Sequence, residues 1–258
     1  MKVTVHGCGG SGGVPLASIE PGGNWGACDP ANPKNRRRRV SIRVEEGATS
    51  LLVDASPDLR LQLLDNGVTR LDALLFTHAH GDHCHGIDDL RALSYSQGGP
   101  IDAYMDAGTR AQLTQRFDYV FASSRNPDSL YPAILADRPI DGPFSVGDID
   151  VVPFVQTHGA GTSLGFRFGP AAYSTDLSSL DEAAFAALEG VRLWIVDCLR
   201  YKPHPTHTHF DQTMEWIARL KPERAVLTHM NHEVDYEELL ARCPPGVEPG
   251  YDGLVVEL

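Results

Sequence analysis

The sequence predicts an α/β fold in which mixed β-sheets are flanked by helices. Short β-rich apolar runs occur together with helical patterns, but the two do not alternate as regular βαβ units, which favours a sandwich over a doubly wound parallel sheet. Apolar residues make up 42% of the 258 residues and charged residues 22%, an ordinary globular composition. The length is at the upper end of single-domain sizes, so we expect one domain over residues 1–258.

The first elements are strands separated by long loops. A strand over residues 2–6 leads into the Gly-rich segment 7–15, which lacks the Lys-Ser/Thr ending of a phosphate-binding P-loop and is expected to be a turn. Residues 22–34 are rich in Gly, Pro and Asn, which predicts a long surface loop. The runs 41–45 and 50–54 predict a hairpin.

Later elements follow from periodicity and punctuation. We expect helices over 56–68, 87–96, 181–190, 211–221 and 236–243, and strands over 71–77, 161–168, 171–176, 192–198, 224–229 and 253–258. Between residues 96 and 155 the pattern of strand, short helix and strand recurs.

Charge and cysteine content limit the classes of partner. The formal net charge of −12 disfavours nucleic acid and anionic membranes as partners. The run Arg36–Arg39 is the local exception, and it predicts either a solvated face or a local anion site. No segment approaches membrane-spanning length, and five scattered cysteines do not resemble a disulfide framework, so a cytoplasmic location is expected.

The segment THAHGDH at 77–83 carries the strongest chemical signal. Imidazole and carboxylate groups at His78, His80, Asp82 and His83 suit first-row divalent ions, zinc or manganese. In an extended loop, side chains alternate, so His78, His80 and Asp82 would share one face while His83 points elsewhere. The alternative is a polar surface loop rich in histidine, which the preceding apolar strand disfavours.

Two metal ions need more ligands than these four. The candidates His158, Asp176 and His229 each end an expected strand. Each alone is a weak signal, because a lone His or Asp at a strand end is usually a structural residue, but together they complete two sites.

In its motifs the chain resembles the metallo-β-lactamase superfamily, which implies an αββα sandwich. The motifs are Asp54, the segment 77–83, His158, Asp176 and His229, in that order. The resemblance implies two divalent ions, Zn or Mn. One set of ligands would be His78, His80 and His158, the other Asp82, His83 and His229, with Asp176 between the ions. Asp54 would orient the metal-binding loop by hydrogen bonds.

Within that superfamily the chain looks most similar to the PhnP-like phosphodiesterases. This rests on the Gly-rich start with GGVP at 12–15, the Arg-rich stretch, and the spacing of His207 to the segments 211–217 and 227–232. The resemblance implies a phosphodiesterase for a small cyclic or nucleotide-like phosphodiester. A hydroxide that bridges the two metal ions would attack phosphorus, with Asp82 and His207 as catalytic residues. His207 would assist the leaving group, and His209 is the second candidate for that role. For the structural zinc of that subgroup only Cys28 and His232 are at plausible positions.

Three other functions stay open from the sequence. A tRNA 3′-processing nuclease needs a basic RNA surface, which the net charge of −12 disfavours. A lactone or thioester hydrolase could use the same hydroxide. A non-catalytic carrier of the PQQ-biosynthesis type usually has a degraded metal motif, and this motif is intact. The expected partner is a small-molecule phosphodiester, with no membrane and no nucleic acid; a homodimer is left open.

Overall fold

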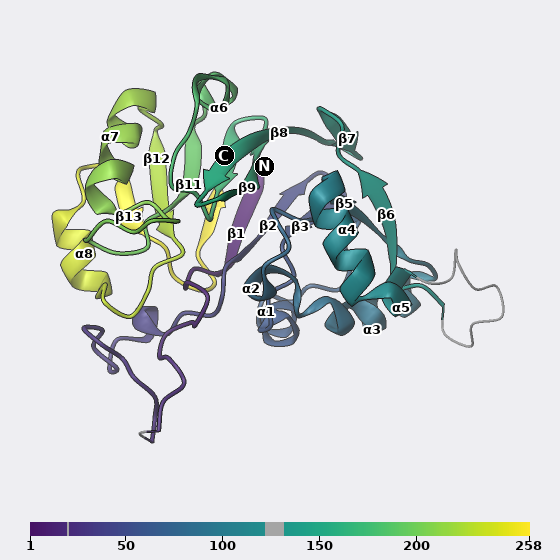
Figure 1. Ribbon diagram of the computed structural model, residues 1–258, viewed down its shortest axis with the longest axis horizontal. Helices are drawn as coiled ribbons and strands as arrows, with labels where there is room; N and C mark the ends of the chain where they lie inside the picture. The colour runs from purple at the N-terminus through teal and green to yellow at the C-terminus, as the bar shows by residue number, and fades with distance from the viewer. Residues whose placement is uncertain (20, 122–131) are drawn as a thin grey trace.

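The computed structural model describes residues 1–19, 21–121 and 132–258, in which the strands form two seven-stranded sheets (Figure 1). The strand order is β14-β1-β2-β3-β4-β5-β6 in the first sheet and β13-β12-β11-β10-β9-β8-β7 in the second. In the first sheet the pairs from β14 to β3 are antiparallel and those from β3 to β6 are parallel. In the second sheet the pairs from β13 to β10 are parallel and those from β10 to β7 are antiparallel. The predicted sandwich of mixed sheets flanked by helices is therefore confirmed.

The elements have the following bounds. The first sheet contains β1 (Lys2–Gly7), β2 (Ser41–Glu46), β3 (Thr49–Val53), β4 (Ala73–Leu75), β5 (Ile101–Met105), β6 (Leu135–Pro139) and β14 (Val255–Glu257). The second contains β7 (Phe144–Val146), β8 (Ile149–His158), β9 (Gly161–Phe168), β10 (Ala171–Ser174), β11 (Leu193–Asp197), β12 (Arg224–Thr228) and β13 (Val247–Pro249). The helices are α1 (Leu59–Asp65), α2 (Gly81–Cys84), α3 (Arg91–Gln97), α4 (Ala107–Arg116), α5 (Asp118–Phe121), α6 (Glu182–Leu188), α7 (Phe210–Leu220) and α8 (Tyr236–Arg242), with 3₁₀ turns η1 (Pro33–Asn35) and η2 (Ile87–Leu90).

Two hydrophobic clusters hold the layers together. Because side chains alternate along a strand, Leu51 and Val53 of β3 join the cluster between the two sheets, whereas Leu52 faces the opposite way. Leu52 packs with Leu59 of α1 and Leu113 of α4 in the second cluster. Helices α1, α3, α4 and α5 therefore lie on the first sheet, and α7 and α8 lie beside the second (Figure 1).

The observed elements differ from the predicted ones in two short strands, β4 inside the first sheet and β13 at the edge of the second. Of the expected strand 71–77, only residues 73–75 form a strand, β4, and β13 was not predicted. A three-residue strand ending in Pro249 at the edge of a sheet leaves almost no periodic signal. Part of the expected strand–helix–strand pattern falls at 122–131, outside the described residues.

At the centre of the Arg36–Arg39 run, Arg37 belongs neither to a solvated face nor to an anion site. Arg37 is only 2% exposed. Its Nη1 donates to the main-chain oxygens of Asn231, at 3.1 Å, and Val234, at 2.8 Å, while Nη2 donates to Asn35 Oδ1 at 3.2 Å. We call Arg37 and these three partners the Arg37 staple. It ties the N-terminal loops to the segment that follows β12.

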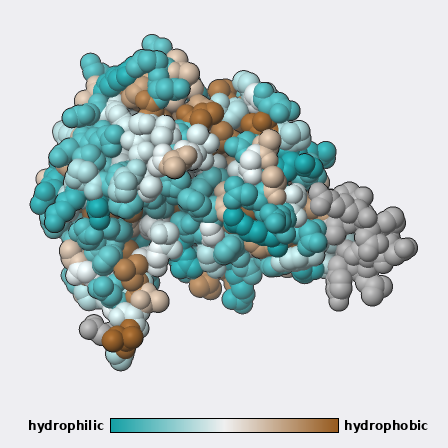
Figure 2. All heavy atoms as spheres, viewed as in Figure 1, coloured by the Kyte–Doolittle hydropathy of each residue, from teal (hydrophilic) through white to brown (hydrophobic). Residues whose placement is uncertain are grey.

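No helix in the described parts of the chain is long and apolar enough to cross a membrane. The face shown in Figure 2 is mostly hydrophilic, and apolar residues appear on it in scattered groups.

Candidate metal centre

The ends of five strands from both sheets deliver the candidate residues to one place. Asp54 follows β3, the segment 77–83 follows β4, His158 ends β8, Asp176 follows β10 and His229 follows β12. Asp54, Asp176 and His229 all have a positive φ, of 62°, 55° and 57°. This conformation is costly for a residue with a side chain and occurs often at functional sites. The strained turns aim these side chains across the strand ends.

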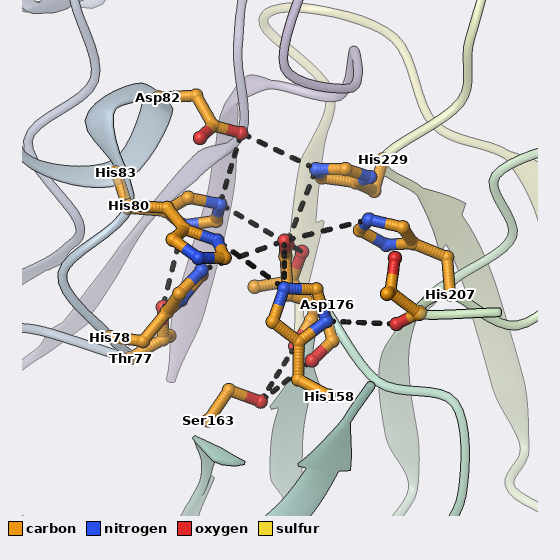
Figure 3. Close-up of polar contacts among 12 residues, drawn as sticks. Thr77, His78, His80, Asp82, His83, His158, Ser163, Asp176, His207 and His229 are labelled. Atoms are coloured by element: carbon orange, nitrogen blue, oxygen red, sulfur yellow. Dashed lines mark hydrogen bonds and ion pairs between the residues drawn. The ribbon is translucent and has the colours of Figure 1, made fainter. Parts of the chain in front are cut away.

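The first ligand group contains His78, His80, His158 and Asp176. Their donor atoms all lie within 4.8 Å of one another (Figure 3). His158 is held by its Nδ1, 2.8 Å from the main-chain oxygen of Thr206, which leaves Nε2 for the group.

The second ligand group contains Asp82, His83, Asp176 and His229, within the same limit of 4.8 Å. The expectation that Asp82 shares a face with His78 and His80 is therefore wrong. Residues 81–84 form a helical turn, α2, instead of continuing as an extended loop, so the alternation stops at His80. The turn carries Asp82 and His83 to the other group, as the family resemblance implies.

Asp176 lies between the two groups. Its Oδ1 is 3.1 Å from His83 Nε2 and 3.2 Å from His229 Nε2. Its Oδ2 is 3.5 Å from His158 Nε2 and 3.7 Å from His78 Nε2. One oxygen thus faces each group, which is the placement that a carboxylate shared by two ions requires.

The buried nitrogens of this cluster fit metal ions. Nε2 of His78, His83 and His229 is buried and makes no hydrogen bond with any described residue. Buried polar atoms are nearly always paired, so three unpaired nitrogens directed at one carboxylate indicate a missing partner that accepts electron pairs. Imidazole and carboxylate ligands in this number suit two zinc or manganese ions.

The charge distribution attracts cations. Burial alone would lower the pKa of His83, yet the carboxylates of Asp176, Asp54 and Asp82 raise it well above its usual value. Burial likewise opposes protonation of His229, and Asp176 and Asp82 nevertheless raise the pKa of His229 to about 9. The carboxylates therefore stabilise positive charge at the positions where metal ions would be bound.

Asp54 accepts hydrogen bonds from the metal-binding loop, as the resemblance implies. Its Oδ2 accepts from His83 Nδ1 at 2.7 Å and from Thr77 Oγ1 at 2.8 Å, and its Oδ1 accepts from the Thr77 main-chain N–H at 2.9 Å. Such contacts fix the ring orientation and tautomer of a ligating histidine.

His207 lines the cleft and forms a third set of potential metal ligands with Asp176, Asp197 and His229. His209 is the N-cap residue of α7 and belongs to none of these sets. His207 Nε2 is 3.9 Å from Asp176 Oδ2, and its Nδ1 is 3.0 Å from Asp197 Oδ2. Asp197 is fully buried, and it also accepts from the main-chain N–H of Asp176 at 3.1 Å. Sequence reasoning missed Asp197, although it ends an apolar strand just as Asp176 and His229 follow theirs.

The cluster forms the floor of a cleft of about 560 Å³. Residues from three other places complete the walls: Ser11 from the Gly-rich loop, Ala160, Gly161, Thr162 and Thr206 from the second sheet side, and Asp106, Gly108, Thr109 and Gln112 at the start of α4.

Cys28 and His232 do not form a metal site in the described part of the chain. The Cys28 thiol lies 3.2 Å from the main-chain oxygen of Val234 and 3.6 Å from that of His232. Neither residue belongs to a group of three or more ligating side chains among the described residues. His85 also stays outside the groups and packs its ring against Phe117.

A family model described as a β-lactamase superfamily domain matches residues 49–230. The chain is 32% identical over 257 residues to the octanoyltransferase of Porphyromonas gingivalis (strain ATCC BAA-308 / W83). That alignment covers 98% of this chain but 51% of the other, so the chain spans about half the length of this relative.

Two solved structures are similar over their full lengths. A crystal structure of a new diphosphatase from the PhnP family has a TM-score of 0.90 and 32% identity, covering 100% of this chain and 97% of the other. Zn²⁺-bound PqqB from Methylobacterium extorquens has a TM-score of 0.76 and 20% identity, covering 100% of both chains, a likeness of fold alone.

Proposed function

Because the chain belongs to the metallo-β-lactamase superfamily and is similar to a PhnP-family enzyme, we propose that it is a two-metal phosphodiesterase acting on a small phosphodiester. His78, His80, His158 and Asp176 would hold one ion, and Asp82, His83, His229 and Asp176 the other. Bound there, two divalent ions would lower the pKa of a water molecule and offset negative charge on phosphoryl oxygens.

The observation that carries the proposal is the Asp197–His207 pair beside Asp176. The hydrogen bond between Asp197 Oδ2 and His207 Nδ1 fixes the ring and leaves Nε2 directed into the cleft. In its protonated form, His207 can donate a proton from Nε2 to the oxygen that leaves phosphorus. A diester with an alkoxide leaving group needs such a donor.

The lining of the cleft favours a phosphodiester over an octanoyl thioester. Among the described residues that line it, only Ala79 and Ala160 have aliphatic side chains, so there is no Val, Leu or Ile to pack against an eight-carbon chain. The name of the Porphyromonas relative belongs to a protein about twice as long, of which the alignment covers 51%. The five free cysteines support a reducing, cytoplasmic location.

The test is a turnover assay with Zn- or Mn-reconstituted protein. The substrates are bis-p-nitrophenyl phosphate, cyclic nucleotides and a diphosphate diester, with a lactone and an octanoyl thioester as carbonyl controls. We expect hydrolysis of phosphodiesters, poor hydrolysis of the carbonyl esters, and close to two ions per chain by metal analysis. Efficient thioester or lactone cleavage without turnover of any phosphodiester would refute the proposal, and a well-folded preparation holding no more than one ion would refute the two-metal mechanism.

A further inference from the structure

The wall of the cleft opposite the metal groups contains a carboxylate and no basic side chain among the described residues. Among the described residues that line the cleft there is no lysine or arginine, and apart from histidine there is no aromatic ring. The start of α4 contributes Asp106, Thr109 and Gln112 to this wall, which we call the α4 wall. These residues lie outside the candidate ligand groups.

Asp106 brings a carboxylate that is not neutralised by a cation. Its Oδ1 accepts from the Thr109 main-chain N–H at 2.6 Å, and no ion pair to Asp106 occurs in the described residues. The second carboxylate oxygen is available to accept a hydrogen bond from a ligand hydroxyl. A second phosphate placed against Asp106 would meet like charge, and no described residue that lines the cleft is a lysine or arginine that could offset it.

Gln112 offers the complementary donor. Its Oε1 accepts from Arg116 Nη2 at 2.8 Å, and Arg116 Nη1 donates to the main-chain oxygen of Ala79. Because a guanidinium only donates, the amide oxygen of Gln112 must face Arg116, and the amide NH₂ has no acceptor among the described residues and can donate to a ligand. These two acceptors hold the Arg116 guanidinium in place, and Arg116 is not among the described residues that line the cleft.

From this wall we infer that the part of the substrate beyond the scissile phosphodiester is an uncharged, hydroxyl-bearing group such as a glycerol or sugar moiety. A carboxylate acceptor beside an amide donor matches hydroxyl groups. The lack of Phe, Tyr and Trp among the described lining residues removes the surface on which a nucleobase would stack or a quaternary ammonium would be held. The inference rests on the proposed function and specifies its substrate class.

The experiment compares diesters that differ only in the distal group. Glycerophosphoglycerol, its analogue with a phosphate on the distal hydroxyl, glycerophosphoethanolamine and the acyclic glycerol diester of adenosine 5′-monophosphate are each measured as kcat/KM relative to bis-p-nitrophenyl phosphate. We expect glycerophosphoglycerol to exceed the phosphate-bearing analogue by at least about tenfold, a typical pocket discrimination. Gln112→Arg and Asp106→Asn should each reduce that ratio severalfold.

Matched controls separate a local effect from a general one. Gln115→Arg adds the same charge to α4 at an exposed position outside the cleft lining, and Asp181→Asn alters the N-cap of α6, which accepts from Ala184 N at 2.8 Å as Asp106 does from Thr109. Neither control should change the ratio. A wild-type preference for the phosphate-bearing or nucleobase-bearing diester, or an equal shift in Gln115→Arg, would overturn the inference while leaving the proposed function intact. If bis-p-nitrophenyl phosphate and every other diester remain uncleaved, the proposed function itself fails.

Discussion

The metal centre and the Arg37 staple are both built from buried polar groups, but they differ in how those groups are paired. In the metal centre, Nε2 of His78, His83 and His229 lacks a hydrogen bond in the described structure. In the staple, both terminal nitrogens of Arg37 donate to oxygens of Asn231, Val234 and Asn35. Arg37 Nε is also without a hydrogen-bond partner among the described residues, so what distinguishes the candidate metal centre is that three such nitrogens lie close to one carboxylate, that of Asp176.

The largest expected effect is in the metal centre. Asp176→Ala removes the carboxylate whose two oxygens face the two ligand groups. We expect turnover to fall by on the order of a thousandfold or more, together with a loss of bound metal measured by elemental analysis. Because the strand ends are set by the sheets, circular dichroism should show a folded protein. Full activity with normal metal content would remove the bridging role from Asp176.

The next effect depends on the leaving group. General acid help is typically worth about a hundred- to ten-thousandfold, but only when the departing oxygen needs a proton. His207→Ala should therefore slow cleavage of alkyl diesters strongly and spare bis-p-nitrophenyl phosphate, because nitrophenolate is stable as an anion. Asp197→Asn should show the same selectivity to a smaller degree.

Equal losses on both kinds of substrate would mean that His207 only packs near the site. His209→Ala is the control, and leaving-group selectivity in that variant would transfer the acid role to His209.

The candidate ligands could be predicted because they stand at strand ends. An apolar run that ends in His or Asp is visible locally, which is why His158, Asp176 and His229 could be proposed and why Asp197, which ends the run 193–196 in the same way, could have been. The grouping of Asp82 with His83 could not be predicted from alternation, because α2 depends on local turn formation after Gly81.

Arg37 could not be assigned from the sequence because its partners are distant in the chain. Asn231 and Val234 lie 194 and 197 residues further along, and only the completed sandwich brings them to the guanidinium. A basic run by itself gives no sign of which of its members will be buried.

The staple predicts a stability effect without a chemical one. Arg37→Met would leave the main-chain oxygen of Asn231 without the guanidinium donor and that of Val234 with only the Cys28 thiol, so the free energy of unfolding should fall by about 3 kcal/mol. The activity of the folded fraction should persist. Arg38→Met is the control, because Arg38 pairs with an exposed Asp65 carboxylate and such pairs contribute roughly 0.5 kcal/mol. Chemical denaturation measures both, and equal losses would contradict the special role of Arg37.

A stability effect that depends on pH concerns Asp252, a buried carboxyl next to the staple. It accepts from the main-chain N–H of Cys8 at 3.2 Å and of Arg38 at 2.8 Å, but burial still raises the pKa of Asp252 to about 7. In the unfolded chain the pKa of this carboxyl is near 3.8, so it loses its proton at a lower pH. Between pH 4 and pH 7 the native state therefore binds more protons, and its stability falls as pH rises, by up to about 1 kcal/mol per pH unit.

Asp252→Asn should remove that component. The comparison is the difference in unfolding free energy between the wild type and the variant, measured by urea denaturation from pH 4 to pH 8. Below its unfolded pKa of 6.5, His6, whose pKa burial lowers to about 3, gives an opposite dependence, but both proteins contain it and the difference cancels it. Asp65→Asn, which makes the same substitution at an exposed carboxyl, is the control. A constant difference between wild type and Asp252→Asn across this range would mean that Asp252 is ionised in the folded protein at acid pH, and that its two main-chain hydrogen bonds outweigh its burial.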